Sequence, residues 1–304
     1  MALDPSARRR LAGVLAACAL SAAGAVVSTP HASASHRSRP AATHTSGCGE
    51  SRTAGRYRHV VWIVMENQGY AQATDAAAAP YLARLAQACG LATNYVALAH
   101  PSLPNYISLT AGSTEGIADD GEPAAHPLEV ANLFGQLHGD WRALEESMPH
   151  ACDTVTSGEY AARHNPAVYF TNLRAECRRD DIPLGLPLQL SSAFTFITPN
   201  VCDDMHSCPV STGDRWLSRI VPLITASRAY RAGAMVLFIT FDESDTGPGN
   251  HVATYVVAPS VRPGTRSAAR FDAYSLLRTT EQLLHLPLLG GARRARPMVR
   301  AFNL

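Results

Sequence analysis

The chain has 304 residues, of which 46% are hydrophobic and 17% are charged, as in an ordinary globular protein. Its 26 basic and 25 acidic residues leave a formal net charge of +1, and every basic residue among the 26 is an arginine. Proteins that bind nucleic acids normally carry a strongly basic face, so this near-neutral balance argues against that class. The length suits one large domain or two small ones.

The first 34 residues have the pattern of a secretory signal peptide. Arg8–Arg10 supply the positive charge, Leu11–Val27 is apolar, and Ala32-Ser33-Ala34 matches a cleavage site. We therefore expect cleavage after Ala34 and a secreted mature chain. The alternative is a lipoprotein anchor at Cys18, although the apolar sequence continues beyond that residue. No later stretch approaches the ~20 apolar residues that a membrane-spanning helix needs.

Two segments follow the predicted signal peptide. Residues 35–56 are rich in Ser, His, Arg and small residues, and they are predicted to be a flexible leader. Residues 57–304 show no internal repeat and are predicted to form one domain. In chain order we expect a strand at 59–65, helices at 80–89, 104–110 and 129–138, a strand at 194–198, a helix at 214–230, strands at 235–241 and 252–258, and a helix at 273–286.

The predicted strands are unbroken apolar runs, which are typical of strands buried on both faces of a parallel sheet. Because these strands alternate with helices, the sequence indicates an α/β fold with a mainly parallel sheet.

Six cysteines remain after the signal peptide, an even number that favours disulfides in an exported protein. Their order along the chain favours the pairs Cys48–Cys89, Cys152–Cys177 and Cys202–Cys208, although six cysteines allow 15 pairings. The alternative is a zinc site made by Cys202, His206 and Cys208, which an oxidising compartment disfavours.

Acidic residues follow three of the predicted strands. Glu66 comes directly after strand 59–65, Asp203 and Asp204 lie just past strand 194–198, and Asp242-Glu243 follow strand 235–241. In open α/β sheets, ligands bind beyond the carboxyl ends of the strands. We therefore expect these groups to converge on one edge of the sheet.

The run His100-Pro101-Ser102-Leu103-Pro104 places a hydroxyl where a turn passes into a predicted helix, with Pro104 suited to the first helical position. Unpaired backbone N–H groups and the positive end of the helix dipole would surround Ser102, a setting typical of a bound phosphate. Serine is also a common N-cap, so the position alone decides little.

Together these residues suggest a metal-assisted phosphate site. Coordination of the Ser102 oxygen to a metal would lower the pKa of the hydroxyl and activate it as a nucleophile. Oxygen ligands suit Ca²⁺, Mg²⁺ or Mn²⁺ better than a soft metal. The candidate ligands are Glu66, Asn67, Asp242 and Glu243.

A second and more zinc-like site would use Asp203 or Asp204 with His206 and His251. Without a metal, those histidines would instead bind phosphate oxygens and protonate the leaving group.

Each cluster also has a structural explanation. Glu66-Asn67 can cap the next element, Asp242–Asp245 can be a solvated acidic loop, and His206 can be a plain loop residue. His100 and His164 belong to a residue type that is more often on the surface or hydrogen-bonded than catalytic. Competing motifs for serine hydrolases, zinc proteases and P-loop proteins are absent from the sequence.

Five blocks carry most of these residues: HVVWIVMEN (59–67), HPSLPNYISLTAG (100–112), FITPNVCDDMHSC (196–208), VLFITFDES (236–244) and NHVATYVVAPSVRPGT (250–265). They resemble the bacterial phosphoesterase family, which contains secreted acid phosphatases and phospholipases C within the alkaline-phosphatase-like superfamily. A softer match is GEYAARHNPAVYF (158–170). The resemblance covers nearly the whole mature chain and implies a three-layer α/β/α sandwich.

The resemblance also implies a role for each candidate residue. Ser102 matches the nucleophile that forms a phosphoseryl intermediate, and His206 and His251 match groups on the leaving-group side. The residues matching polar groups around the phosphate are His100, Asn105 and His164. The residues matching metal ligands are Glu66, Asn67, Asp242 and Glu243, with Asp204 as a further candidate. The pair Asp242-Glu243 departs from the Asp-His pair of alkaline phosphatases proper, which favours one hard metal over two zinc ions.

Within the family, the chain resembles the compact secreted acid phosphatases, including those that act on phosphoinositides such as phosphatidylinositol 3-phosphate. We therefore expect a monomeric phosphomonoesterase with one or two divalent ions per chain and a phosphomonoester substrate. The alternatives are a phosphodiesterase of the phospholipase C type and a catalytically silent envelope protein with the same fold. An arginine cluster within residues 293–300 either holds an anionic headgroup or is a solvated tail.

Overall fold

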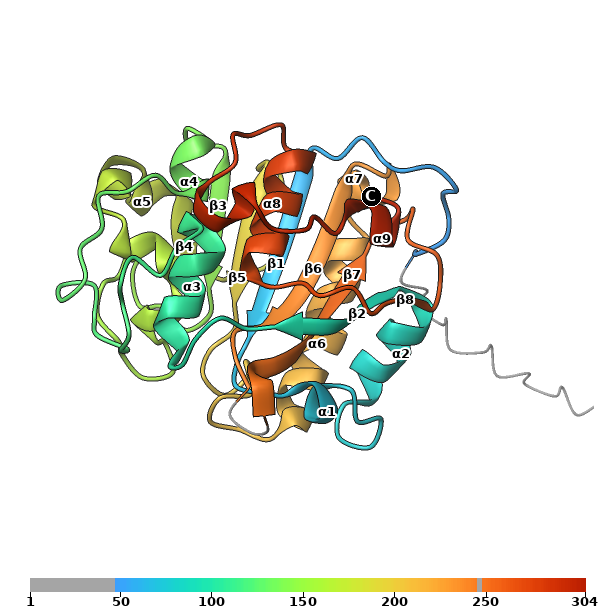
Figure 1. Cartoon of the computed structure of the whole chain (residues 1–304). Helices are drawn as coiled ribbons and strands as arrows, with labels where there is room; N and C mark the ends of the chain where they lie inside the picture. Colours follow the sequence, from blue (N-terminus) through green and yellow to red (C-terminus); the bar gives the residue numbers. More distant parts are fainter. Residues whose placement is uncertain (1–46, 245–247) are drawn as a thin grey trace, which may run out of the picture. The chain divides into compact units, whose positions relative to one another are not determined.

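An eight-stranded sheet forms the centre of the structure, a computed structural model that describes residues 47–244 and 248–304 (Figure 1). The strand order across the sheet is β4-β3-β5-β1-β6-β7-β2-β8. The strands are β1 (His59–Met65), β2 (Gly90–Val96), β3 (Trp141–Glu145), β4 (Asp181–Pro183), β5 (Phe194–Thr198), β6 (Met235–Phe241), β7 (His251–Val257) and β8 (Thr265–Ser267).

Most neighbouring strands are parallel. β1 pairs in parallel with β5 on one side and with β6 on the other, and β3 pairs in parallel with β4 and β5. β7 is the exception, since it runs antiparallel to both β6 and β2. The first residue of β7 therefore lies at the same edge of the sheet as the carboxyl ends of β1 and β6.

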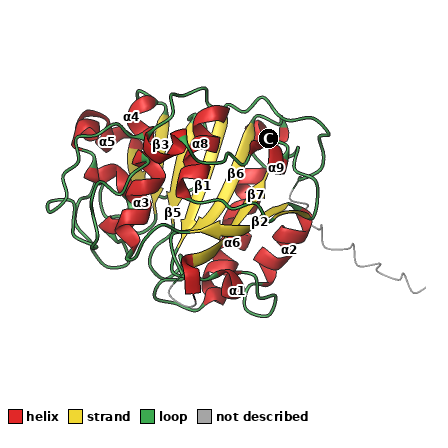
Figure 2. Ribbon diagram, viewed as in Figure 1, coloured by secondary structure: helices red, strands yellow, loops and turns green. Residues whose placement is uncertain are grey.

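Helices cover both faces of this sheet. In Figure 2, α3 and α8 pack together in front of the strands, and α6 lies behind them. The α-helices are α1 (Tyr70–Ala73), α2 (Pro80–Ala88), α3 (Ser102–Ala111), α4 (Leu133–Gln136), α5 (Arg174–Asp180), α6 (Val210–Thr225), α7 (Arg228–Arg231), α8 (Ala273–Leu283) and α9 (Val299–Phe302). The 3₁₀ helices are η1 (Ala162–His164), η2 (Pro166–Tyr169), η3 (Thr171–Leu173), η4 (Pro248–Asn250) and η5 (Gly290–Arg293).

The predicted fold class is confirmed: the protein is an α/β sandwich with a mainly parallel sheet between two helical layers. Three predicted strands have the observed bounds, namely β1, β5 and β6, and β7 begins one residue earlier than predicted. Their apolar runs are buried on both faces, which is why the sequence pattern identified them.

Four helix predictions were wrong by two residues or more, and one of them, the helix expected at 273–286, ends at Leu283. The helix expected at 129–138 is only the short α4, because Asn132 accepts the N–H of Gly135 and starts the helix late. The helix expected at 214–230 is two helices, since the Ser227 hydroxyl accepts the N–H of Tyr230 and begins α7 separately. Helix α3 begins at Ser102, two residues before the predicted start. Strands β2, β3, β4 and β8 were not predicted, since they are short or mix polar with apolar residues.

All three predicted disulfides are present, with Cα–Cα separations of 5.4 Å for Cys48–Cys89, 5.3 Å for Cys152–Cys177 and 4.7 Å for Cys202–Cys208. The bond between Cys202 and Cys208 leaves no thiolate for a metal, so the alternative zinc site with His206 was wrong.

The predicted signal peptide and its cleavage site lie outside the described residues, as does Cys18. Of the predicted leader, residues 47–56 are described, and Cys48 and the Ser51 N–H join this segment to Cys89 and to the Pro259 carbonyl. No helix in the described part of the chain has the length and apolar character needed to cross a membrane.

Candidate active site

Side chains from four separate segments meet at the carboxyl edge of the central strands. Glu66 follows β1, Asp204 lies in the loop after β5, and Asp242 and Glu243 follow β6. Ser102 begins α3, which follows β2 in the chain. All five residues are no more than 5% exposed. The structure therefore brings these side chains together at one edge of the sheet, as we expected from the position of the acids after the strands.

The Ser102 hydroxyl donates a hydrogen bond to Glu66 Oε2 at 3.0 Å and makes a longer one to Glu243 Oε1 at 3.4 Å. Ser102 is itself the first residue of α3, and Pro104 is the third rather than the first as predicted. The first helical turn therefore carries the hydroxyl directly to two carboxylates.

Asn67 and Asp242 close the site between β1 and β6. The Asn67 backbone has a φ of 52°, in the left-handed region that asparagine tolerates better than most residues. This turn directs the Asn67 N–H to Asp242 Oδ1 at 3.0 Å. Asn67 Oδ1 and Asp242 Oδ2 are both buried without a hydrogen-bond partner. Two unsatisfied oxygens in one buried site indicate that it is built for a group that is not part of the polypeptide.

Buried negative charge dominates the electrostatics of the site. Burial raises the pKa of Glu66 well above its usual range, and the carboxylates of Asp242 and Asp204 raise it further. Burial likewise raises the pKa of Asp242 to about 6 and raises the pKa of Asp204 strongly. A bound cation would reverse these shifts, because it favours the ionised form of each acid.

His164 lies inside the cluster, between two of the acids. Its Nε2 is 3.4 Å from Glu66 Oε1, and its Nδ1 is 3.2 Å from Asp204 Oδ2. Its ring stacks on the ring of Tyr106 with centroids 5.3 Å apart. Burial lowers the pKa of His164, and the positive charge of Arg163 lowers it further.

Asn105 organises the loop that leads to Ser102. Its Oδ1 accepts the N–H groups of Leu98 and Ala99 at 3.1 and 3.0 Å. Its Nδ2 donates to the carbonyls of Ala99 and Pro101 at 2.9 and 3.3 Å. These contacts hold the loop conformation, and the expected place of Asn105 beside the phosphate stays a prediction.

The other three predicted histidines have different surroundings. His100 is exposed, and its Nδ1 pairs with Glu243 Oε2. His206 is also exposed, but its backbone N–H donates to Asp204 Oδ1 at 2.7 Å. His251 stacks on Tyr70 at 4.6 Å between centroids, and its Nε2 lies 3.0 Å from the Thr93 carbonyl oxygen.

Several residues of the site were missed by the sequence analysis. Tyr106 donates to Glu66 Oε1 at 2.5 Å, and its position one helical turn after Ser102 was a usable signal. Asn250 accepts the Ser244 N–H at 2.8 Å and donates to the Ala99 carbonyl at 2.9 Å, joining two loops of the site. Asp120 reaches the site from a segment without a distinctive pattern, whereas Arg163 lies in the block 158–170, directly before the candidate His164.

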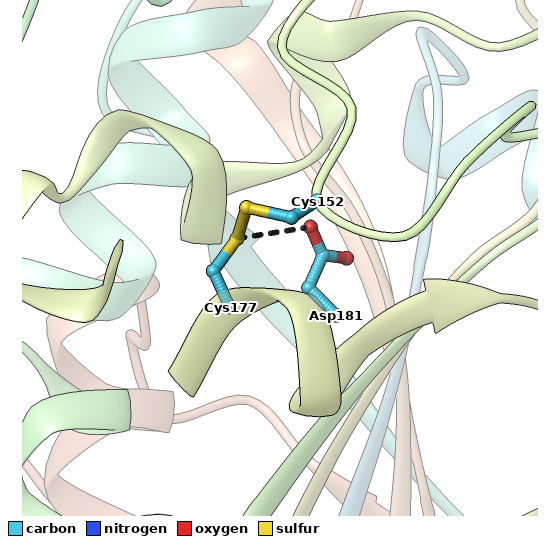
Figure 3. Close-up of side chains that lie close together, drawn as sticks. All are labelled: Cys152, Cys177 and Asp181. Carbon is cyan, nitrogen blue, oxygen red and sulfur yellow. Dashed lines mark hydrogen bonds between the residues drawn. A yellow bond between two sulfur atoms is a disulfide. The ribbon is translucent and has the colours of Figure 1, made fainter. Parts of the chain in front are cut away.

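A second group of potential ligand atoms lies away from this edge (Figure 3). Cys152, Cys177 and Asp181 place their ligand atoms within 4.8 Å of one another. The two sulfur atoms form a disulfide, so neither is a thiolate that can coordinate a metal or a thiol that can donate a proton. This group is therefore a disulfide beside a buried acid.

Comparison with known proteins gives consistent relatives. Residues 71–287 match the model of the phosphoesterase family. The chain is 32% identical over 254 residues to phosphatidylinositol-3-phosphatase of Mycobacterium tuberculosis, covering 80% of this chain and 82% of that protein. It is 28% identical over 235 residues to the phosphate-repressible acid phosphatase of Penicillium chrysogenum, covering 69% of this chain but only 55% of that protein.

The chain belongs to the phosphoesterase family. It is accordingly a phosphoric ester hydrolase of the acid-phosphatase type. A crystal structure of an alkaline phosphatase superfamily protein from Vibrio parahaemolyticus has a TM-score of 0.53, with 9% identity, 80% of this chain and 72% of that chain covered. This similarity supports the superfamily fold.

Proposed function

We propose that this protein is an exported, metal-dependent acid phosphatase that transfers the phosphoryl group of a phosphomonoester to Ser102 and then to water. The observation that carries the proposal is the buried Ser102 hydroxyl at the start of α3, in hydrogen-bond contact with Glu66 and Glu243. A helix N-terminus beside a nucleophile suits a phosphate, and nearby carboxylates suit a cation that activates the hydroxyl.

The case for a metal rests on the donor set. Four buried carboxylates converge, and in the described chain the basic side chains within ion-pair distance of them are two histidines, His100 and His164. The pKa of His164 is lowered by burial, so it does not supply a compensating charge. Several like charges in one buried site are costly unless a cation neutralises them. The residues that would hold it are Glu66, Asn67, Asp242 and Glu243.

All four of these residues offer oxygen, which favours Ca²⁺, Mg²⁺ or Mn²⁺ over a softer ion. Asp204 and His164 would complete a second position if two ions bind. When bound, the metal would lower the pKa of the Ser102 hydroxyl and neutralise charge on the phosphoryl oxygens.

The chain's own groups would then carry the reaction. Ser102 Oγ loses its proton and attacks phosphorus, the bond from phosphorus to the ester oxygen breaks, and the departing alkoxide takes up a proton. Water then attacks the phosphoserine, the bond to Oγ breaks, and Ser102 and inorganic phosphate are released. His206 lies beside the site, where partial desolvation of its ring and the positive charge of Arg163 lower its pKa and so favour the neutral form. We assign it to the exchange of protons with the leaving group and with water.

The substrate class is suggested by the relatives. One similar protein carries the name phosphatidylinositol-3-phosphatase, and others carry the name acid phosphatase. We therefore propose phosphomonoesters in general, with phosphoinositides among them. The chain spans little more than half the length of the fungal acid phosphatases. We therefore do not assign the full activity of those longer proteins to this chain.

Export is supported by the sequence pattern of residues 1–34 and by the three disulfides, which form and persist in oxidising compartments.

The test is phosphate release from p-nitrophenyl phosphate and from its bis-ester, measured side by side on purified residues 35–304. We expect rapid cleavage of the monoester and slow cleavage of the diester, with loss of both after treatment with a chelator and recovery on adding a divalent ion. Faster cleavage of the diester would favour a phosphodiesterase of the phospholipase C type. Absence of both activities with every divalent ion would favour a catalytically silent envelope protein.

The nucleophile has its own test. Ser102→Ala removes the only oxygen that this residue offers to phosphorus, so turnover should fall by at least about 1,000-fold while the melting temperature stays near that of the parent. Acid quenching of the parent enzyme with radiolabelled substrate should trap phosphoserine at position 102. Full activity of Ser102→Ala would overturn the assignment.

A further inference from the structure

The Cys152–Cys177 disulfide lies beside the buried carboxyl of Asp181, and the proposed phosphatase reaction uses none of these three residues (Figure 3). Asp181 Oδ2 is 3.7 Å from Cys177 Sγ. In the described part of the chain, this is the one disulfide with an acidic or histidine side chain whose ligand atom lies within 4.8 Å of both sulfur atoms. The carboxyl therefore distinguishes this disulfide from the other two.

The two sulfur atoms of this disulfide differ in their access to solvent. Cys177 lies on α5 and is only 2% exposed. Cys152 is partly exposed, and residues 154–159, which follow it closely, are exposed. In thiol–disulfide exchange, a thiolate attacks the sulfur that it can reach, and the other sulfur leaves. An incoming thiolate would therefore bond to Cys152, and the sulfur that leaves is the one beside Asp181.

Asp181 can supply the proton that the leaving sulfur needs. A buried thiolate at Cys177 would be costly, because burial disfavours the charged form of the thiol. Burial raises the pKa of Asp181 to about 7, and the charge of Asp153 adds to the rise, so the carboxyl carries its proton in mildly acidic solution. Asn165 Nδ2 donates to the two Asp181 oxygens at 3.1 and 2.9 Å and holds the carboxyl in place.

The backbone of Asp181 also holds both cysteines. Its N–H donates to the Cys177 carbonyl, and its own carbonyl accepts the N–H of Cys152 at 3.0 Å. Neither hydrogen bond depends on the bond between the sulfur atoms. The two cysteines should therefore stay close together after that bond opens, which favours reversible opening.

We propose that the Cys152–Cys177 disulfide is a site of reversible thiol–disulfide exchange with a dithiol, and that Asp181 exchanges a proton with the Cys177 sulfur. This chemistry goes beyond the proposed phosphatase function and does not depend on it. The reactant is a dithiol because its second sulfur can release Cys152 from the mixed disulfide that forms first.

The exchange balances in two steps. One thiolate of the dithiol attacks Cys152 Sγ, the bond between the two cysteines breaks, and the Cys177 sulfur takes the proton of Asp181. The second thiolate of the dithiol then attacks the dithiol sulfur bonded to Cys152, so that the dithiol leaves as a cyclic disulfide. The Cys152 thiolate and the Asp181 carboxylate each take one proton from water, which replaces the two protons lost by the dithiol. Two electrons pass from the dithiol to the cysteine pair.

The role of Asp181 is tested by reducing the folded protein with dithiothreitol at pH 6, where the carboxyl carries its proton. Free thiols are trapped with N-ethylmaleimide and located by peptide mass spectrometry. Asp181→Asn has no proton to transfer, so the opening of Cys152–Cys177 should slow by at least about 10-fold. The Cys48–Cys89 disulfide is the internal control, because it also joins a partly exposed cysteine to a buried one. Its rate of opening should not change.

The direction of this effect separates proton transfer from a structural role. A variant whose fold is loosened would expose its disulfides and open both of them faster. Equal or faster opening of Cys152–Cys177 in Asp181→Asn would therefore overturn the role of Asp181.

Two measurements on the parent protein need no variant. Brief treatment with a limiting amount of glutathione should place the mixed disulfide on Cys152, and an adduct on Cys177 would contradict the assigned direction of attack. After reduction, removal of dithiothreitol and addition of oxidised glutathione should restore the Cys152–Cys177 bond. Failure to restore it would show that the exchange is not reversible and would overturn the proposal. None of these readouts uses phosphatase activity, so they test this site independently of the proposed function.

Discussion

The Tyr106 hydroxyl controls the orientation of Glu66, the acid that accepts a hydrogen bond from Ser102. Tyr106 donates to Glu66 Oε1, and Ser102 donates to Oε2 of the same carboxylate. The Tyr106 ring also supports His164 by stacking at 7° between the ring planes. Tyr106 thus fixes two side chains, Glu66 and His164, that are candidate ligands of the proposed metal. Hydrogen bonds and packing from the residues around a metal site determine how precisely the metal-binding side chains are oriented.

Tyr106→Phe keeps the stack on His164 and removes only the hydroxyl. We expect metal affinity or kcat to fall roughly 10- to 100-fold, because Glu66 loses the donor that fixes its orientation. Metal content by elemental analysis and the kinetics of monoester hydrolysis provide the readouts.

The matched control is Tyr57→Phe, which also loses a buried hydroxyl contact, with Ser260 at 2.6 Å, but just before the amino end of β1. Tyr57→Phe should change stability without changing metal affinity. Equal metal affinity in Tyr106→Phe and the parent, with unchanged kcat, would remove Tyr106 from the site.

The start of α2 depends on a carboxylate from α6. The residue before α2, Ala79, has no side chain that can cap a helix, and Pro80 lacks an N–H. Asp214 fills this role, since its two oxygens accept the N–H groups of Tyr81 and Leu82 at 2.9 and 2.8 Å. The interaction joins two helices that pack against each other. Residues more than 130 positions apart thus share one capping arrangement.

Asp214→Ala leaves two N–H groups at the start of α2 without their acceptor, inside the helix pair. We expect a loss of roughly 2–4 kcal/mol in the free energy of unfolding, which corresponds to several degrees in melting temperature for a chain of this size. Asp214→Asn keeps one acceptor oxygen and should lose less. Chemical denaturation of the three proteins measures the difference, and a parent-like stability of Asp214→Ala would show that the cap contributes little.

At the scale of the whole molecule, a second pair of acids is buried outside the candidate site. Asp181 on β4 is paired with Ala143 of β3, so it shares a sheet face with Glu145, two residues further along β3. Asn165 donates to both Asp181 oxygens, and Thr198 donates to Glu145. Burial is the main reason that the pKa of Asp181 rises to about 7 and that the pKa of Glu145 rises strongly. Asp153 adds to the rise at Asp181.

Because of this buried pair, we expect the free energy of unfolding to fall as the pH rises. Asp181 binds a proton more tightly in the folded state than in the unfolded state, so its contribution is present at acid pH and is lost as the pH rises toward about 7. Melting temperature measured from pH 4 to 8 should therefore decline across this range. Asp181→Asn should flatten the decline, and Asp75→Asn, at an exposed acid, should not. An unchanged slope in Asp181→Asn would assign the pH dependence to other groups.

The arginine cluster expected within residues 293–300 lies on the surface of the protein. Arg293, Arg294, Arg296 and Arg300 are exposed, and the segment packs near the carboxyl end of α3, since the Gly291 N–H donates to the Gly112 carbonyl. Ser102 begins that same helix at its opposite end. The cluster is therefore separated from Ser102 by the length of α3, which argues against a direct role in holding a phosphate at the candidate site.

Local features of the sequence determined the fold class and the interior strands, and the order of the cysteines favoured the observed disulfide pairs. Long apolar runs identify buried strands without knowledge of their partners, and acids placed directly after such strands must lie at the same edge of a parallel sheet. The candidates Glu66, Asp242, Glu243 and Ser102 could therefore be named from the sequence, as could Asp204.

Their contacts were decided by the tertiary structure alone. Ser102 meets Glu66 across 36 residues and Glu243 across 141, and neither distance follows from the spacing in the chain. The same holds for Arg163, which enters from a short 3₁₀ helix, and for Asn105, whose side chain turned out to hold a loop. The start of α2 was also set by such a contact, since Asp214 of α6 accepts its first N–H groups. The physical reason is that hydrophobic periodicity is a local property, whereas hydrogen bonding and charge pairing depend on which segments the packed sheet brings together.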